Sequence, residues 1–134
     1  MSKIKVGIIG VGSCAKSLVE GVQYYNENPE DKVGLMYPDI GGYGTKDIEF
    51  VMGFDIDVRK VNKPLAEALR AAPNCSMNHV NTIHTNGDSN SSCVKSKAMV
   101  YSAPELDGIA PHMHDYPDEV TFVNGAVPAE SFER

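Results

Sequence analysis

The chain has 134 residues and a net charge of −6, with 42% hydrophobic and 22% charged residues. This length suits one domain, and the composition is that of an ordinary globular protein, so we expect a modest buried core and not a disordered chain. The acidic balance offers no basic patch for a nucleic-acid backbone or an anionic membrane surface, so neither is an expected partner.

The start of the chain predicts a cytoplasmic protein. The apolar stretch at residues 4–9 ends at glycines and is too short for a signal peptide or a membrane span. Cys14, Cys75 and Cys93 are odd in number and widely spaced, which favours neither a disulfide framework nor a zinc site. We expect reduced thiols.

Residues 3–9 are rich in β-branched side chains and nearly continuous in apolar character, which predicts a first strand buried by helices on both faces. Residues 13–25 follow with the spacing of an amphipathic helix, which Asn28 and Pro29 end. The expected buried face carries Ala15, Leu18, Val19 and Val22, and the expected exposed face carries Lys16, Ser17, Glu20 and Gln23.

Residues 26–47 have a loop composition and are longer than a usual connection, so they read as an insertion. Residues 48–56 restore β-prone apolar character and predict the second strand, which ends at the acids Asp55 and Asp57. Pro64 suits the first turn of a short helix over residues 65–71, and Pro73 stops that helix.

The signals weaken after residue 74. Residues 76–97 form an uncertain polar segment, residues 98–101 and 120–123 look strand-like, and residues 126–134 read as the start of an unfinished element. The order strand, helix, loop, strand, helix predicts an α/β fold. We expect residues 1–134 to form part of a Rossmann-like, doubly wound domain, with a long insertion between the first helix and the second strand.

One motif carries chemistry: the G-x-G-x-x-A run formed by Gly10, Val11, Gly12, Ser13, Cys14 and Ala15. It lies directly after the first predicted strand and opens the first predicted helix, as in dinucleotide-binding proteins. Gly10 allows the tight turn, Gly12 lets the backbone approach a pyrophosphate, and Ala15 permits close helix packing. The helix N-terminus then stabilises the phosphates. The alternative is a tight glycine turn that binds no ligand.

A dinucleotide site also needs an acid at the end of the second strand, to accept hydrogen bonds from the adenosine ribose. Asp55 fits best, and the insertion explains why its separation from the glycine turn is about twice the usual spacing of about twenty residues. A carboxylate repels a 2′-phosphate, so NAD is the expected cofactor. Asp57 is the alternative acid, and Arg59 and Lys60 leave NADP open.

Several segments together resemble prokaryotic myo-inositol-1-phosphate synthases, also called inositol-3-phosphate synthases. The strongest resemblance lies in residues 6–25, and Ser13 departs from the family there, because relatives commonly carry Asn. Further landmarks follow in the family's order: residues 34–36, 54–57 with 60–61, 73–75 and 106–113. Residues 77–97 match poorly. Together the landmarks span most of the chain.

This resemblance implies the NAD-binding portion of an isomerase. Members of the family convert glucose 6-phosphate to inositol phosphate by NAD-dependent oxidation, enolisation, aldol closure and reduction. The resemblance also implies a homo-oligomer, with a tetramer favoured, and a role in phospholipid biosynthesis. No family catalytic motif is recognisable within these residues, so we assign no catalytic residue and expect the chain alone to be inactive.

Two other readings concern the histidines and Cys14. His112, His114 and Asp115 have ligand side chains, but a loop with a partly exposed histidine pair is the preferred interpretation. Cys14 lies where a helix N-terminus would lower the pKa of a thiol nucleophile, yet a small packing residue is preferred. Alternative functions are a non-catalytic nucleotide-binding module and a Rossmann dehydrogenase of another family.

Overall fold

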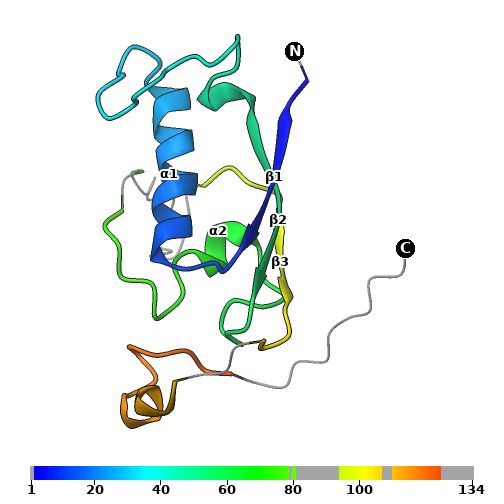
Figure 1. Ribbon diagram of the computed structural model, residues 1–134, viewed down its shortest axis with the longest axis vertical. Coiled ribbons are helices and arrows are strands. Elements are labelled where there is room, and N and C mark those ends of the chain that lie inside the picture. Colours follow the sequence, from blue (N-terminus) through cyan, green and yellow to red (C-terminus); the bar gives the residue numbers. More distant parts are fainter. Residues whose placement is uncertain (1, 79, 81–93, 107–109, 125–134) are drawn as a thin grey trace, which may run out of the picture.

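The computed structural model describes residues 2–78, 80, 94–106 and 110–124 (Figure 1). Its strands are β1 (Ile4–Ile9), β2 (Ile48–Asp55) and β3 (Met99–Ser102), and its α-helices are α1 (Ser13–Glu27) and α2 (Leu65–Ala68). Two 3₁₀ turns, η1 (Thr45–Asp47) and η2 (Pro111–Asp115), complete the described elements. The predicted α/β class is confirmed.

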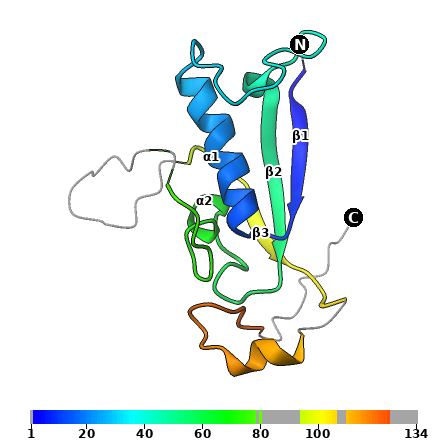
Figure 2. The same cartoon turned by 60° about the vertical axis from the view of Figure 1, so that its left-hand side comes forward.

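The three strands form one parallel sheet in the order β1-β2-β3. Parallel neighbours need crossover connections, and α1 and α2 lie in the two crossovers, on the same face of the sheet in both views (Figures 1 and 2). The carboxyl ends of all three strands therefore meet at one edge, where β1 leads into the glycine turn.

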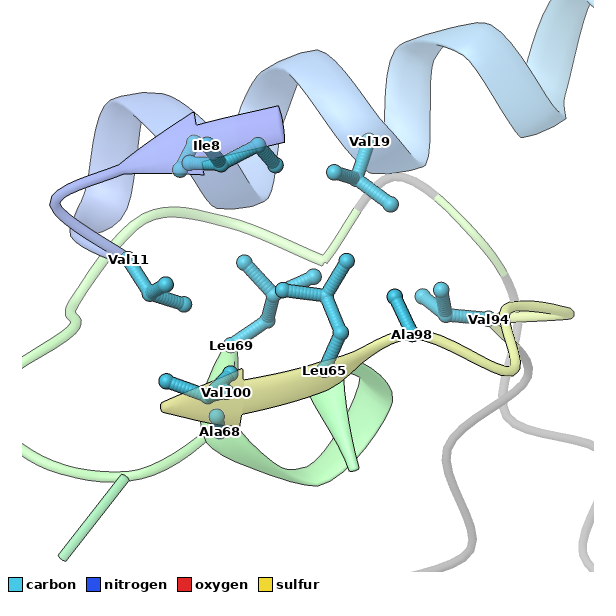
Figure 3. Close-up of a cluster of buried hydrophobic side chains, with 10 residues drawn as sticks. Ile8, Val11, Val19, Leu65, Ala68, Leu69, Val94, Ala98 and Val100 are labelled. Carbon is cyan, nitrogen blue, oxygen red and sulfur yellow. The ribbon is translucent and has the colours of Figure 1, made fainter. Parts of the chain in front are cut away.

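The core lies between the sheet and the two helices (Figure 3). Leu65 and Leu69 near α2 and Val100 of β3 are fully buried, and so is Val11 from the glycine turn. At the centre of β2, Gly53 leaves room for these side chains, because a Cβ there would lie 3.0 Å from Val11 Cγ2 and 3.3 Å from Val100 Cγ2. The glycine turn is thus part of the core.

The first strand is in place, but its predicted burial on both faces is wrong. Only Ile8 of β1 is buried, whereas Ile4 is 42% and Ile9 89% exposed. The reason is that α1 and α2 both cover one face, so in the described part of the chain the opposite face of β1 has no layer on it.

The buried face of α1 also differs from the prediction. Ala15 and Val19 are buried as expected, but Leu18 is 52% exposed, and the supposedly outward Lys16 and Glu20 are 3% and 0% exposed. Lys16 is buried because its ammonium group donates to the carbonyls of Ser76 at 2.6 Å and Met77 at 3.0 Å. These hydrogen bonds to a distant segment satisfy the buried ammonium group, so a charged residue can lie on the buried face of α1.

The ends of the other elements lie close to their predicted positions. The second helix ends at Ala68 and not at Ala71, and residues 120–123 form no strand, although the backbone of Val58 donates to the Val123 carbonyl at 3.0 Å. The predicted strand near residues 98–101 is confirmed as β3. Residues 28–44 run through turns. The hydroxyl of Tyr24 in α1 donates a hydrogen bond to the Asp31 carboxylate at 2.7 Å, which ties this segment to the helix.

Most of the uncertain polar segment, and all of residues 126–134, lie outside the described residues. Within the described part of the chain, no helix is long and apolar enough to cross a membrane.

Replacing Gly53 by alanine should destabilise the protein by about 1 to 2 kcal/mol, because the new methyl overpacks a core whose nearest atoms belong to Val11 and Val100. Gly21→Ala is the matched control: nothing lies within 4 Å of its Cβ position in α1, so it should stabilise the helix by about 0.5 to 1 kcal/mol. Urea unfolding of the two variants measures both effects. Equal stabilisation by both would show that the core absorbs the methyl.

Candidate functional site

The glycine turn joins β1 to α1. Gly10 has a φ of 87°, a conformation that glycine adopts without strain, and its N–H donates to the Phe54 carbonyl at 2.8 Å. The α1 helix begins at Ser13, with no side chain capping its N-terminus and no acidic residue in its first turn. The first N–H groups of a helix have no partner within it, so this end of α1 can receive an anion.

A pocket of about 800 Å³ opens at the carboxyl ends of the strands. The glycine turn contributes Gly10, Gly12 and Ser13 to its wall, and the end of β2 contributes Asp55. A Cβ at Gly12 would meet no described atom within 4 Å, so the space in front of it is open to a ligand. The rest of the wall is formed by Ile9, Phe54, Ile56, Lys60, Pro73, Asn74, Ser102, Ala103, Pro104, Glu105, Leu106 and Phe122.

Asp55 is only 9% exposed, and both of its carboxylate oxygens accept backbone hydrogen bonds. Oδ2 accepts from the N–H of Val11 at 2.7 Å, and Oδ1 accepts from the N–H of Asp57 at 2.9 Å. A carboxylate has about four lone-pair sites, so Asp55 keeps capacity for a ligand hydroxyl. The predicted acid therefore lies in the pocket wall and is also bonded to the glycine turn.

Lys60 lies beneath the turn and is 3% exposed. Its ammonium group donates to the carbonyl of Val11 and to Asn74 Oδ1, both at 2.9 Å, and lies 3.8 Å from Asp55 Oδ2. Burial lowers the pKa of Lys60, and the charges of Asp55 and Asp57 oppose that shift. A cation in this place offsets the charge of Asp55, which would otherwise repel a bound phosphate.

A second loop is fastened to the start of α1. The hydroxyl of Ser13 accepts the N–H of Cys75 at 3.1 Å, and the amide of Asn74 donates to Val11 and Leu69 carbonyls at 3.0 Å each. The preferred reading of Cys14 as a packing residue is wrong, because its side chain is exposed; Ala15 packs in the core instead. Ser13, at the start of α1, thus holds the loop that carries Asn74 and Cys75.

Asp57, the alternative acid, is fully buried away from the pocket wall. Its carboxylate accepts from Arg59 Nε at 2.9 Å and Nη2 at 2.6 Å, and from the N–H of Val123 at 3.1 Å. Arg59 also donates to the carbonyl of Thr121 at 2.7 Å. The pair therefore fastens residues 118–124 beside the end of β2, where Phe122 joins the pocket wall.

The histidine pair lies apart from this pocket. His112 and His114 are exposed on η2, which lies beyond the carboxyl ends of the strands in Figures 1 and 2. Among the described residues, no group of three His, Cys, Asp or Glu side chains could hold a metal ion.

The fold and pocket define the class of protein: an α/β protein of Rossmann-like topology, with its candidate site at the carboxyl ends of parallel strands. Two solved structures share this fold. The structure of Ari2 matches with a TM-score of 0.52 and 25% sequence identity, and the match covers 75% of this chain and 29% of the Ari2 chain. A myo-inositol-1-phosphate synthase-related protein from Thermotoga maritima has a TM-score of 0.55 at 21% identity, covering 75% of this chain and 22% of its own.

The chain is similar in sequence to inositol-3-phosphate synthases. The chain is 40% identical over 122 residues to an inositol-3-phosphate synthase from Corynebacterium glutamicum, covering 90% of this chain and 31% of that protein. It is 39% identical over 115 residues to an inositol-3-phosphate synthase from Mycolicibacterium smegmatis, and this match covers 84% of this chain and 29% of that protein. The predicted resemblance is confirmed: this chain is a relative of the inositol-3-phosphate synthases. It spans under a third of their length. No family model matches.

Sequence reasoning found the glycine turn and Asp55 but missed the side chains that hold the turn. Lys60 and Asn74 lay within family landmarks, but Lys60 was considered only as a residue that leaves NADP open, and Asn74 was assigned no role. A lysine five residues after the predicted strand-end acid was the available signal, since buried cations pair with carboxylates. Lys16 gave no such signal, because its partners are backbone carbonyls.

The Asp57–Arg59 pair predicts a pH dependence of stability. Burial raises the pKa of Asp57, but hydrogen bonds from Arg59 and Val123 outweigh it and hold the pKa below its ordinary value. A carboxyl group with a lowered folded-state pKa stabilises the fold above its unfolded-state pKa, and this contribution is lost as pH falls through the folded-state value.

We therefore expect Asp57→Asn to lower the free energy of unfolding by about 1 to 2 kcal/mol at neutral pH, with the difference from wild type shrinking below about pH 4. Urea unfolding across this pH range measures it. Asp115→Asn, on the exposed face of η2, is the control and should change little. A difference that does not vary with pH would contradict the ion-pair account.

Proposed function

We propose that this chain is the NAD-binding portion of an inositol-3-phosphate synthase. The similarity over 90% of the chain to a relative of that name supports the family. The proposal of NAD as the cofactor rests on one observation: Gly12, the start of α1 and Asp55 all face one pocket, although they come from segments about forty residues apart. These are the groups that a dinucleotide's pyrophosphate and adenosine ribose require.

The residues present fit such a cofactor. The N-terminus of α1 has neither a capping side chain nor an acid, so its N–H groups are available for the pyrophosphate. Asp55 offers its remaining lone pairs to ribose hydroxyls, and its charge disfavours the 2′-phosphate of NADP. Asp57 has its oxygens bonded to Arg59 and Val123, which favours Asp55 for this role.

In the complete protein, the proposed reaction converts glucose 6-phosphate to inositol phosphate without net oxidation. NAD would supply hydride acceptance and return. The residues of this chain would bind the adenosine and pyrophosphate end and orient the cofactor. In the described part of the chain, three charged side chains lie in the pocket wall: Asp55, Lys60 and Glu105. The first two bond to the glycine turn, and Glu105 accepts from the amide of Asn124. We therefore propose that the catalytic acids, bases and cations of the family lie elsewhere in the full-length protein.

Asp55→Ala should weaken NAD binding at least tenfold, because a charge-assisted hydrogen-bond pair contributes about 2 kcal/mol and a tenfold change in affinity corresponds to about 1.4 kcal/mol. Asp57→Ala should have far less effect, since that carboxylate is buried against Arg59. Isothermal titration of NAD into the purified chain and its variants measures both, with circular dichroism showing that each variant is folded.

A second ligand separates ribose contact from support of the turn. If Asp55 meets the ribose, Asp55→Ala should also narrow the preference for NAD over NADP, because the charge that repels the 2′-phosphate is gone. Equal losses of affinity for NAD and NADP in Asp55→Ala would mean that Asp55 supports the glycine turn without contacting the ribose. A loss confined to Asp57→Ala would reverse the assignment.

The purified chain should form no inositol phosphate from glucose 6-phosphate and NAD. Enolisation and aldol closure need positioned acid, base and cationic groups, each worth orders of magnitude in rate. Product analysis measures this, with the full-length Corynebacterium glutamicum relative as positive control. Turnover by the chain alone would require a catalytic site within it, and His112, His114, Lys95 and Lys97 would be the first residues to replace.

A further inference from the structure

The backbone of Val11 is held from both sides by side chains of other segments. Its N–H donates to Asp55 at 2.7 Å, while its carbonyl accepts from Lys60 at 2.9 Å and from the amide of Asn74 at 3.0 Å. These partners are 44, 49 and 63 residues away along the chain. Val11 is one of the variable positions of the glycine motif, so the motif itself assigns its backbone no partner.

The carbonyl of Val11 determines where the next N–H points. A trans peptide is planar, and its C=O and N–H point in opposite directions. Because Lys60 and Asn74 bind the Val11 carbonyl, the N–H of Gly12 must point to the opposite side of the peptide from these two side chains. The residue itself borders open space, since a Cβ on Gly12 would meet no described atom within 4 Å. A rotated Val11–Gly12 peptide would instead present a carbonyl oxygen, which repels a phosphate.

The free energy of burying Lys60 is coupled to this geometry. An ammonium group that is 3% exposed is costly to bury unless it is hydrogen-bonded, and Lys60 has Val11, Asn74 and the nearby Asp55 as partners. Rotating the Val11–Gly12 peptide would take one hydrogen-bond acceptor from the buried ammonium group of Lys60. It would also take both donors, Lys60 and Asn74, from the Val11 carbonyl. The bonded conformation is therefore strongly favoured before any ligand arrives.

We propose that Lys60 and Asn74 are positioning residues that preset the Val11–Gly12 peptide for phosphate binding, acting through their hydrogen bonds to the Val11 carbonyl. The cofactor part of this inference rests on the proposed function. The presetting itself belongs to the ligand-free protein, so it can be measured without a cofactor. The Asn74→Ala variant distinguishes the loss of a positioning hydrogen bond from the loss of a positive charge, because replacing Asn74 leaves the net charge unchanged.

The first experiment is amide hydrogen exchange on the ligand-free 134-residue chain. Lys60→Met and Asn74→Ala should each raise exchange about tenfold in peptides covering residues 10–15, the equivalent of one buried hydrogen bond, and leave β2 unchanged. Lys60→Arg should restore part of the protection. Lys63→Met is the control, because the Lys63 side chain is half-exposed and its ammonium group pairs with Glu67 on α2 at 3.0 Å, away from the glycine turn.

Exchange in the turn equal to wild type in both variants would overturn the proposal. Faster exchange throughout the chain would also overturn it, since Lys60 and Asn74 would then support the whole fold and not the turn.

The second experiment compares ligands with and without a pyrophosphate. Lys60→Met and Asn74→Ala should weaken ADP-ribose and NAD binding about tenfold while leaving adenosine binding unchanged, and Lys63→Met should change neither. A loosened turn with unchanged ADP-ribose affinity would refute the link to phosphate binding. Failure of the wild-type chain to bind NAD would refute the proposed function, whereas the exchange result would still decide whether the turn is preset.

Discussion

The pairing of buried charges around one peptide, that of Val11, is the constraint on which the candidate site depends. Asp55 and Lys60 are almost wholly removed from solvent and lie 3.8 Å apart, so each needs hydrogen bonds that the surrounding backbone supplies. Because Asp55 belongs to β2 and Val11 follows β1, the strand end and the glycine turn hold each other in place. The pocket is formed by the same interactions that stabilise the fold around it.

A second ion pair, between the buried Asp57 and the partly exposed Arg59, supports another part of the pocket wall. Asp57 and Arg59 bond to the backbone of residues 118–124, a segment about sixty residues away along the chain. This holds Phe122 in the pocket wall, although no helix or strand anchors it. The adjacent acids Asp55 and Asp57 therefore have different structural roles, one toward the glycine turn and one toward this returning segment.

The sheet explains the exposure of its own apolar residues. Ile8, Gly53 and Val100 face the helices, and side chains alternate along a strand, so Phe54 and Tyr101 point to the other face, with ring centroids 6.0 Å apart. The glycine turn needs only the covered face, because Val11 and α1 both pack there. The geometry of the pocket thus follows from one layer of helices on three parallel strands.

The sequence alone determined the order of the first elements, the glycine turn, the acid at the end of β2 and the family resemblance. Those features are local, since the conformation of Gly10 and the alternation of apolar residues depend on neighbours in the chain. Only the tertiary structure decided that Lys16 is buried, that Lys60 and Asn74 hold the turn, and that Asp57 turns away from the pocket. Their partners lie far along the chain, 60 residues for Lys16 and 49 for Lys60. A polarity pattern records that a side chain is charged, but not which distant group will neutralise it once the chain has folded.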